Sequence, residues 1–153
     1  MSTQQPLVVD NVLTGADAHV AAWVEQKLGG DTVDVPFYAI GITGEGGALI
    51  GGAYFYNYRS GDANDICCAV AVEDGNTISR DVLRKILSYP FGQLSLPRIS
   101  IEIDESNQRA IEQADIIGFK LEGRKRRAGK GGGDILLMGL LRDECKFWSE
   151  QPK

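Results

Sequence analysis

Apolar positions along the chain recur with two different periods, and each period predicts one kind of element. Alternation with period two is typical of strands, whereas spacings of three and four residues are typical of amphipathic helices. Residues 98–104 alternate isoleucine with polar side chains, which predicts a half-buried strand. By the same criteria, further strands are predicted over 7–13, 37–42, 48–58, 66–72, 119–128 and 135–141, and helices over 17–28, 78–87 and 110–117.

The order of these elements indicates the fold class. The strand 66–72 is apolar throughout and consists largely of small residues, which is typical of a central strand covered on both faces. A helix and the strand 98–104 follow within roughly forty residues, the spacing of a right-handed parallel crossover. We therefore expect one α/β domain over 1–153, with a mixed sheet of about seven strands and three or four helices.

Local signals predict where two of the helices end or begin. Pro90 is expected to end or kink the helix 78–87, because proline lacks the N–H that a helix needs. Ser106 or Asp104 can cap the helix 110–117, and Gly118 is expected to end it.

Composition narrows the class of protein. The chain has 43% hydrophobic residues and a formal net charge of -5, which excludes intrinsic disorder. No run approaches the ~18–20 apolar residues that cross a membrane, and the polar start lacks the apolar core of a signal peptide. A cytoplasmic protein with no membrane partner is expected. The acidic balance also disfavours a dedicated nucleic-acid binder.

The three cysteines and the single histidine offer little metal or redox chemistry. Cys67 and Cys68 are adjacent and point to opposite faces of a strand, so they are expected to be reduced and structural, as is Cys145. His19 lies in the helix 17–28 and is expected to be a surface or half-buried helix residue, not a catalytic one. One histidine makes no zinc cluster, and no metal is expected.

Two local clusters carry candidate binding chemistry. Tyr54, Tyr56 and Tyr58 fall on one face of a strand, where they line an aromatic cleft or form an ordinary amphipathic face. The run Arg-Lys-Arg-Arg at 124–127, with Lys130, is a basic cluster in an acidic chain. Its role stays open between an acidic substrate, RNA phosphates, the phosphates of a cofactor, and a charged hairpin edge that prevents pairing between sheets.

The most specific pattern lies between residues 98 and 145. It contains Ser-Asn-Gln-Arg-Ala at 106–110, Gly-Phe-Lys-Leu-Glu-Gly at 118–123, Arg126, and a leucine-rich strand that leads into Arg-Asp-Glu-Cys at 142–145. This series resembles the GNAT superfamily of acyl-CoA-dependent N-acyltransferases, and within it the ribosomal-protein N-terminal (Rim-type) acetyltransferases. A phage origin would fit the compact form. The resemblance implies a GNAT-type mixed, mostly antiparallel seven-stranded sheet flanked by helices, whose central parallel pair, 66–72 and 98–104, splays apart.

The resemblance also implies a reaction. Acetyl-CoA would be the co-substrate, and its acetyl group would pass directly to a primary amine in a ternary complex, with no metal. The amine would be a protein N-terminus, a lysine or a small amine. The pantetheine arm would be hydrogen-bonded by Asn107 and by the backbone of one strand, at Cys68, Ala69, Val70, Ala71 and Val72.

The implied pyrophosphate loop departs from the family pattern. Such a loop presents backbone N–H groups to a diphosphate at the start of a helix. Asp74 stands at the Arg/Gln position of the pattern and Thr77 at its central glycine, so the loop is expected to be degenerate. The cofactor-binding residues implied by position are Gly75, Thr77, Ser79 and Arg80.

The usual proton donors of the family are missing. Ala114 and Ala110 stand where its members carry a tyrosine and a serine. Another group must then protonate the departing thiolate, and a base must accept the proton of the amine. By position, the candidate acids are Ser106 and Tyr56, and the candidate bases are Glu73 and Glu102.

A second hypothesis belongs to a different class of protein. The missing acids and the degenerate loop also fit a catalytically inactive GNAT-fold binding module that docks a protein or nucleic-acid partner. The sequence leaves a homodimer open.

Overall fold

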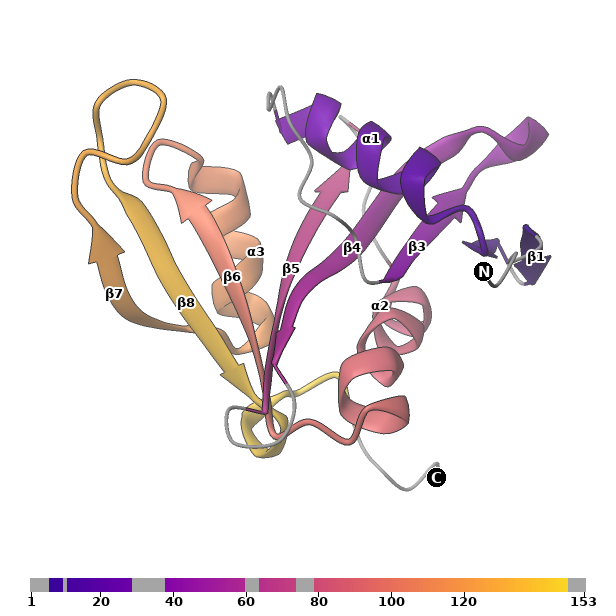
Figure 1. Ribbon diagram of the computed structural model, residues 1–153. Helices are drawn as coiled ribbons and strands as arrows, with labels where there is room; N and C mark the ends of the chain where they lie inside the picture. The colour runs from indigo at the N-terminus through magenta and orange to yellow at the C-terminus, as the bar shows by residue number, and fades with distance from the viewer. Residues whose placement is uncertain (1–5, 10, 29–37, 60–63, 74–78, 149–153) are drawn as a thin grey trace. The chain divides into compact units, whose positions relative to one another are not determined.

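The computed structural model describes residues 6–9, 11–28, 38–59, 64–73 and 79–148 of the 153-residue chain (Figure 1). The described strands are β1 (Leu7–Val9), β2 (Val12–Thr14), β3 (Tyr38–Thr43), β4 (Leu49–Arg59), β5 (Asp65–Val72), β6 (Arg98–Asp104), β7 (Lys120–Lys125) and β8 (Ile135–Leu141). The α-helices are α1 (Asp17–Leu28), α2 (Arg80–Leu87) and α3 (Gln108–Ile117). Short turns of other helix types are η1 (Glu45–Gly47), η2 (Ser88–Gln93) and η3 (Arg142–Glu144).

The strands form a mixed sheet in the order β1-β2-β3-β4-β5-β6-β8-β7. β5 and β6 run parallel, with Cys67 opposite Ser100, and α2 lies between them in the chain. The pairs β1–β2, β2–β3, β3–β4, β6–β8 and β7–β8 are antiparallel. This confirms the predicted α/β class with a mostly antiparallel sheet and a parallel crossover.

The described part of the chain has eight strands rather than the expected seven. The segment 7–13, predicted to be one strand, forms the hairpin of β1 and β2 instead. Asn11 lies in its turn with φ +67, a left-handed conformation that asparagine tolerates better than most residues. The alternation of apolar residues does not reveal such a tight turn.

The chain forms two compact units, and β5 contributes to both. Unit 1 comprises Met1–Tyr58 and Cys68–Ile86, and unit 2 comprises Arg59–Cys67 and Leu87–Lys153. The single domain expected over 1–153 stays a prediction.

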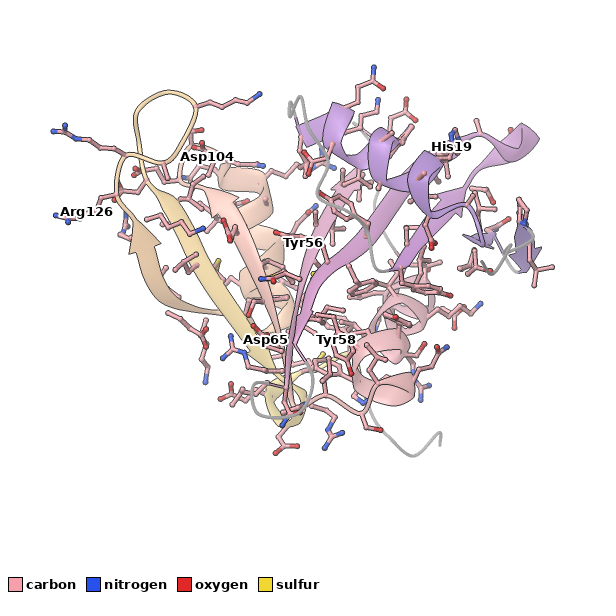
Figure 2. The ribbon with its side chains drawn as sticks, viewed as in Figure 1. His19, Tyr56, Tyr58, Asp65, Asp104 and Arg126 are labelled. Atoms are coloured by element: carbon pink, nitrogen blue, oxygen red, sulfur yellow. The ribbon has the colours of Figure 1, made fainter. Side chains whose placement is uncertain are left out.

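Unit 1 has its core where α1 packs on the sheet. Val20, Ala21 and Val24 of α1 are fully buried in one cluster with Ala39, Tyr54 and Ala71. Gly52 makes this approach close, because a Cβ there would lie 3.1 Å from methyl groups of both valines. α1 has the predicted bounds, and His19 is exposed on it, as expected (Figure 2).

In unit 2, α3 has a capping residue at its start and a glycine at its end. The cap is Asn107, whose Oδ1 accepts the backbone N–H of Ala110 at 3.2 Å. The prediction of Ser106 or Asp104 as the cap was wrong, because Asp104 instead accepts the N–H of Ser106 within the preceding turn. Gly118, with φ +120, ends the helix as predicted, in a conformation that favours glycine.

The helical path at α2 is longer than the sequence indicates. α2 ends at Leu87 and continues as the π-helical turn η2, in which the N–H of Leu94 donates to the carbonyl of Tyr89 at 3.0 Å. Pro90 lies inside this turn, where it is buried. Pro90 therefore marks the end of regular α-helix, as predicted, but the chain keeps a wider helical path through it.

Candidate functional site

A row of polar side chains crosses unit 2 where β5 and β6 begin. Arg98 of β6 donates through Nε to Asp65 of β5 at 3.2 Å, and through Nη2 and Nη1 to the two carboxylate oxygens of Glu122 of β7 at 2.6 and 3.2 Å. The Ser100 hydroxyl donates to Asp65 at 2.9 Å and accepts from Arg98 at 3.0 Å. The hydrogen bond with Glu122 is the main reason why the pKa of Arg98 is raised. The row thus joins three strands through one guanidinium.

Gly139 of β8 makes this row possible. β8 lies between β6 and β7, so the pair of Arg98 and Glu122 must pass over it. A Cβ at residue 139 would lie within 2.4–2.5 Å of the carboxylate and the guanidinium. The periodicity of the sequence does not reveal this network, although an isolated glycine inside an apolar strand is a recognised signal for close approach.

In unit 1, a phenol and a carboxylate meet beside the α1 core. The hydroxyl of Tyr54, a residue only 1% exposed, donates to Oε1 of Glu25 on α1. The ring of the half-buried Tyr56 lies 5.5 Å from that of Tyr54, at a tilt of 39°. These two tyrosines share a face, as predicted. Asn57, between Tyr56 and Tyr58 in β4, has φ +52, a left-handed conformation, and the row of three tyrosines stays a prediction.

Glu73, a predicted base, directly follows β5 in unit 1. Its N–H donates to the carbonyl of Ile50 at 2.8 Å, which fixes the backbone at this point. Its carboxylate is about half exposed and lies 3.9 Å from the ammonium of Lys27. That ammonium also sits 5.3 Å from the ring centroid of Trp23. Glu73 therefore keeps an accessible carboxylate, and its neighbour Lys27 also makes a cation–π contact with Trp23.

The predicted pantetheine-binding stretch is the second half of β5, also in unit 1. Ala69 and Ala71 pack on the α1 core cluster, while Val70 is 39% exposed. The expectation that this strand is covered on both faces along its whole length was therefore wrong at Val70. Cys68 is buried and Val72 half-buried.

The predicted pyrophosphate loop is described only at its end. Gly75 and Thr77, like Asp74, lie outside the described residues. Ser79 caps α2, since its Oγ accepts the N–H of Val82 at 3.1 Å. Arg80, the first residue of α2, is exposed.

The remaining predicted site residues, all in unit 2, have partners of their own. Glu102 is held by Lys125, with Nζ 3.2 Å from each carboxylate oxygen. The exposed Ser106 donates its hydroxyl to Asp104 at 2.7 Å. Asn107, the α3 cap, uses only its carbonyl oxygen for that role, and an amide group has two further donors on its nitrogen.

Other chemistry is limited in the part of the chain that the structure describes. No group of three or more His, Cys, Asp or Glu side chains there is arranged to hold a metal ion. Among the same residues, no helix has the length and apolar character to traverse a bilayer. Cys67, Cys68 and Cys145 are all buried, and no disulfide joins cysteines among the described residues, as expected for reduced thiols.

The mixed sheet with its β5–α2–β6 parallel crossover has the GNAT-type fold. No family model matches the chain, and no curated protein matches it in sequence. Solved structures do match. A chimera of spermidine N-acetyltransferase SpeG from Vibrio cholerae and hSSAT shares 19% identity at a TM-score of 0.59, over 68% of this chain and 66% of that one.

Two further structures give the same result. Mutant forms of the Vibrio cholerae spermidine/spermine N-acetyltransferase SpeG share 19% identity at a TM-score of 0.61, over 69% of this chain and 67% of theirs. A probable acetyltransferase shares 24% identity at 0.59, over 69% of this chain and 62% of its own. The match thus spans about two thirds of these proteins, and at such identities it establishes the fold. The Rim-type branch and the phage origin stay predictions.

Proposed function

We propose that the protein is an acetyl-CoA-dependent N-acetyltransferase that acts on a primary amine by direct transfer in a ternary complex. The observation that carries the proposal is the fold, in which a β5–α2–β6 parallel crossover interrupts an antiparallel sheet. Two solved spermidine N-acetyltransferases share this fold at TM-scores of 0.59 and 0.61, and a probable acetyltransferase shares it at 0.59. Spermidine is named as the substrate of two of them, which supports an amine acceptor here.

The backbone of β5 is the proposed support for the pantetheine arm. A strand offers N–H and C=O groups at regular spacing, and the amides of pantetheine can pair with them as an added strand does. The side chains of Ala69 and Ala71 are small and point into the α1 core, so they add no bulk along this stretch. One N–H of β5 would polarise the thioester carbonyl, a fixed dipole that stabilises the developing oxyanion.

Asn107 and the start of α2 are the other proposed contacts of the cofactor. The amide nitrogen of Asn107 would donate to a pantetheine carbonyl while its oxygen keeps capping α3. At α2, the Ser79 hydroxyl retains its own hydrogen for donation and Arg80 supplies a cation for the diphosphate. Gly75 and Thr77 complete this proposal as residues of the loop.

The proposed chemistry needs one base and one acid. Glu73 would accept a proton from the ammonium of the acceptor, the free amine would attack the thioester carbon, and the C–S bond would break. Tyr56 would protonate the departing thiolate of CoA and would regain a proton from the nitrogen of the new amide, which leaves that amide neutral. The alternative base and acid are Glu102 and Ser106. Glu102 is less suited, because Lys125 lies 3.2 Å from it, closer than Lys27 lies to Glu73, and Ser106 directs its hydrogen to Asp104.

Calorimetric titration with acetyl-CoA tests the proposal, with Asn107 variants that separate binding from folding. Asn107→Asp and Asn107→Ser keep a side-chain oxygen as the α3 cap but remove the amide donors. We expect micromolar binding by the wild type, at least about tenfold weaker binding by both variants, and unchanged thermal unfolding. No wild-type binding at millimolar acetyl-CoA would overturn the proposal and favour the inactive binding module.

The acceptor is identified by a transfer assay. Wild-type protein and acetyl-CoA would be incubated separately with each of three amines: spermidine, a lysine-containing peptide with a blocked N-terminus, and a peptide with a free N-terminus. Release of CoA that depends on one of these amines assigns the acceptor class. Release that is equal with and without every amine would mean hydrolysis and would contradict the proposed transfer.

A further inference from the structure

The loop between β7 and β8 in unit 2 is held in place by three carboxylates that bind its backbone. Asp104 accepts the N–H of Lys130 at 3.3 Å, and Asp134 accepts the N–H of Arg127 at 3.0 Å. Glu105 accepts the N–H of Asp134. Within the loop, the N–H of Gly129 donates to Gly133 at 2.8 Å and that of Gly132 to Gly129 at 3.1 Å. Despite its four glycines, the loop therefore has a fixed conformation.

The cations of this region fall into two groups. Arg124 lies 3.3 Å from Asp134 and 3.7 Å from Glu105, and Lys125 pairs with Glu102, so both are neutralised within unit 2. Arg126, Arg127 and Lys130 are exposed, and no ion pair joins them to another side chain in the described parts of the chain. Arg126 points away from the strands (Figure 2). We call residues 126–133 the basic finger.

The predicted strand 119–128 was wrong beyond Lys125. β7 ends before Arg126, and Arg127 takes φ +60 in the turn. The backbone thus places both guanidinium groups on a loop instead of along a sheet edge. A charged edge against pairing between sheets explains Arg124 and Lys125 of the edge strand β7, but not the three cations of the basic finger.

The net negative charge of the rest of the chain limits which anionic partners the basic finger can bind. Five of the 16 basic residues lie in 124–130, which leaves 11 against 21 acidic residues, a net charge of -10 elsewhere. A long polyanion that extended more than roughly 10 Å past the basic finger would be repelled by that surface. The basic finger also lacks aromatic side chains on which nucleic-acid bases stack. A short acidic segment meets neither obstacle.

We propose that the basic finger is a docking site for a short acidic segment of another polypeptide, rich in Asp or Glu. Arg126, Arg127 and Lys130 receive its carboxylates, and the arginines can each hold one in a bidentate manner. Because three carboxylates already fix the loop, docking costs little loop entropy. The site goes beyond the proposed acetyl transfer and does not depend on it.

Fluorescence anisotropy with short labelled peptides, in the absence of acetyl-CoA, tests this site. The probes are a peptide with four Asp and Glu residues, a peptide with four Lys residues, and a single-stranded RNA of four phosphates. We expect the wild type to bind the acidic peptide more tightly than the RNA. The variant R126Q/R127N/K130Q should bind it about tenfold more weakly, since each exposed ion contact contributes a few-fold at most.

A matched control variant distinguishes binding at the basic finger from attraction by the overall charge of the protein. K85Q/K120Q/K146Q also removes three positive charges, but at lysines outside the basic finger. It should bind the acidic peptide as tightly as the wild type does. Thermal unfolding verifies that both variants fold, and if the triple variant does not, R126Q and K130Q alone should each weaken binding two- to threefold. The charge-reversal variant R126E/K130E should bind the Lys peptide more tightly than the acidic peptide.

Three results would overturn the proposal. The first is no binding of the acidic peptide by the wild type at low salt. The second is an equal loss in both triple variants, which would mean attraction by overall charge. The third is tighter binding of the RNA than of the acidic peptide, lost in R126Q/R127N/K130Q, which would assign the basic finger to nucleic acid.

Discussion

Arg98 of β6 and Glu122 of β7 form a bidentate ion pair across β8, with N–O distances of 2.6 and 3.2 Å. The pair passes over Gly139, and on its other side Arg98 holds Asp65 at the start of β5. A single guanidinium therefore fixes the positions of β5, β6 and β7 in unit 2. Its partners are only partly buried, so the geometry of the row matters more than the strength of any one pair.

Gly139→Ala should destabilise the protein by up to about 1 kcal/mol, because the new methyl group would displace the ends of the Arg98 and Glu122 side chains from β8 and weaken a partly exposed ion pair. Urea denaturation measures the change. Gly131→Ala is the control, since a Cβ there meets nothing within 4 Å, and its stability should stay within about 0.5 kcal/mol of the wild type. Equal stability of the two variants would show that the pair does not need the space at Gly139.

Asp104 should make stability depend on pH in the acid range. The N–H and the hydroxyl of Ser106 donate to its carboxylate and lower its pKa below the ordinary 3.8. The unfolded chain thus binds this proton more readily than the folded one, so the stability contributed by Asp104 is present above pH 3.8 and is lost as the pH falls through the lower, folded pKa. Urea midpoints measured from pH 5 down to pH 2 should fall less steeply in Asp104→Asn.

Ser106→Ala provides the control for this pH effect. It removes the hydroxyl donor but keeps the backbone N–H, which is the larger of the two causes. Its midpoints should therefore show a slope between those of the wild type and Asp104→Asn. Identical slopes in all three proteins would contradict the assignment.

How far the sequence predicts this protein depends on the distance between the residues that interact. Periodicity within a single element sufficed for the bounds of α1 and for the strand Arg98–Asp104. It could not show that residues 98 and 122 meet over residue 139, because that contact depends on the register of three strands. In the site, the tyrosine pair followed from alternation, whereas the phenol–carboxylate bond to Glu25 joins elements 29 residues apart.

Glu73→Gln should lower the rate of acetyl transfer about a hundredfold at pH 7 if Glu73 is the base, without changing the affinity for acetyl-CoA. The loss should shrink at high pH, where more of the acceptor amine is already deprotonated. A purely structural role for Glu73 would leave the shape of the pH–rate profile unchanged. Glu45→Gln, at an exposed residue of η1, is the control and should retain the wild-type rate.

Tyr56→Phe should slow transfer about tenfold or more while leaving the urea midpoint and acetyl-CoA binding intact, because it removes only the proposed proton donor. Tyr58→Phe removes a phenol hydroxyl two residues further along β4, past Asn57 with its left-handed φ, and should retain activity. The rates of both variants would be compared with acetyl-CoA and the amine saturating. Full activity of Tyr56→Phe would exclude this tyrosine as the acid and return the role to Ser106.

The three thiols should resist alkylation in the folded protein. All are buried, and burial raises the pKa of the Cys145 thiol, which reduces the fraction of reactive thiolate near neutral pH. With iodoacetamide at pH 7.5, intact-mass spectra should show slow labelling in buffer and three labels per chain in urea. Peptide mapping would identify the first cysteine to react. Rapid labelling of Cys145 without unfolding would mean that the segment around η3 opens readily, and would contradict a structural role for this thiol.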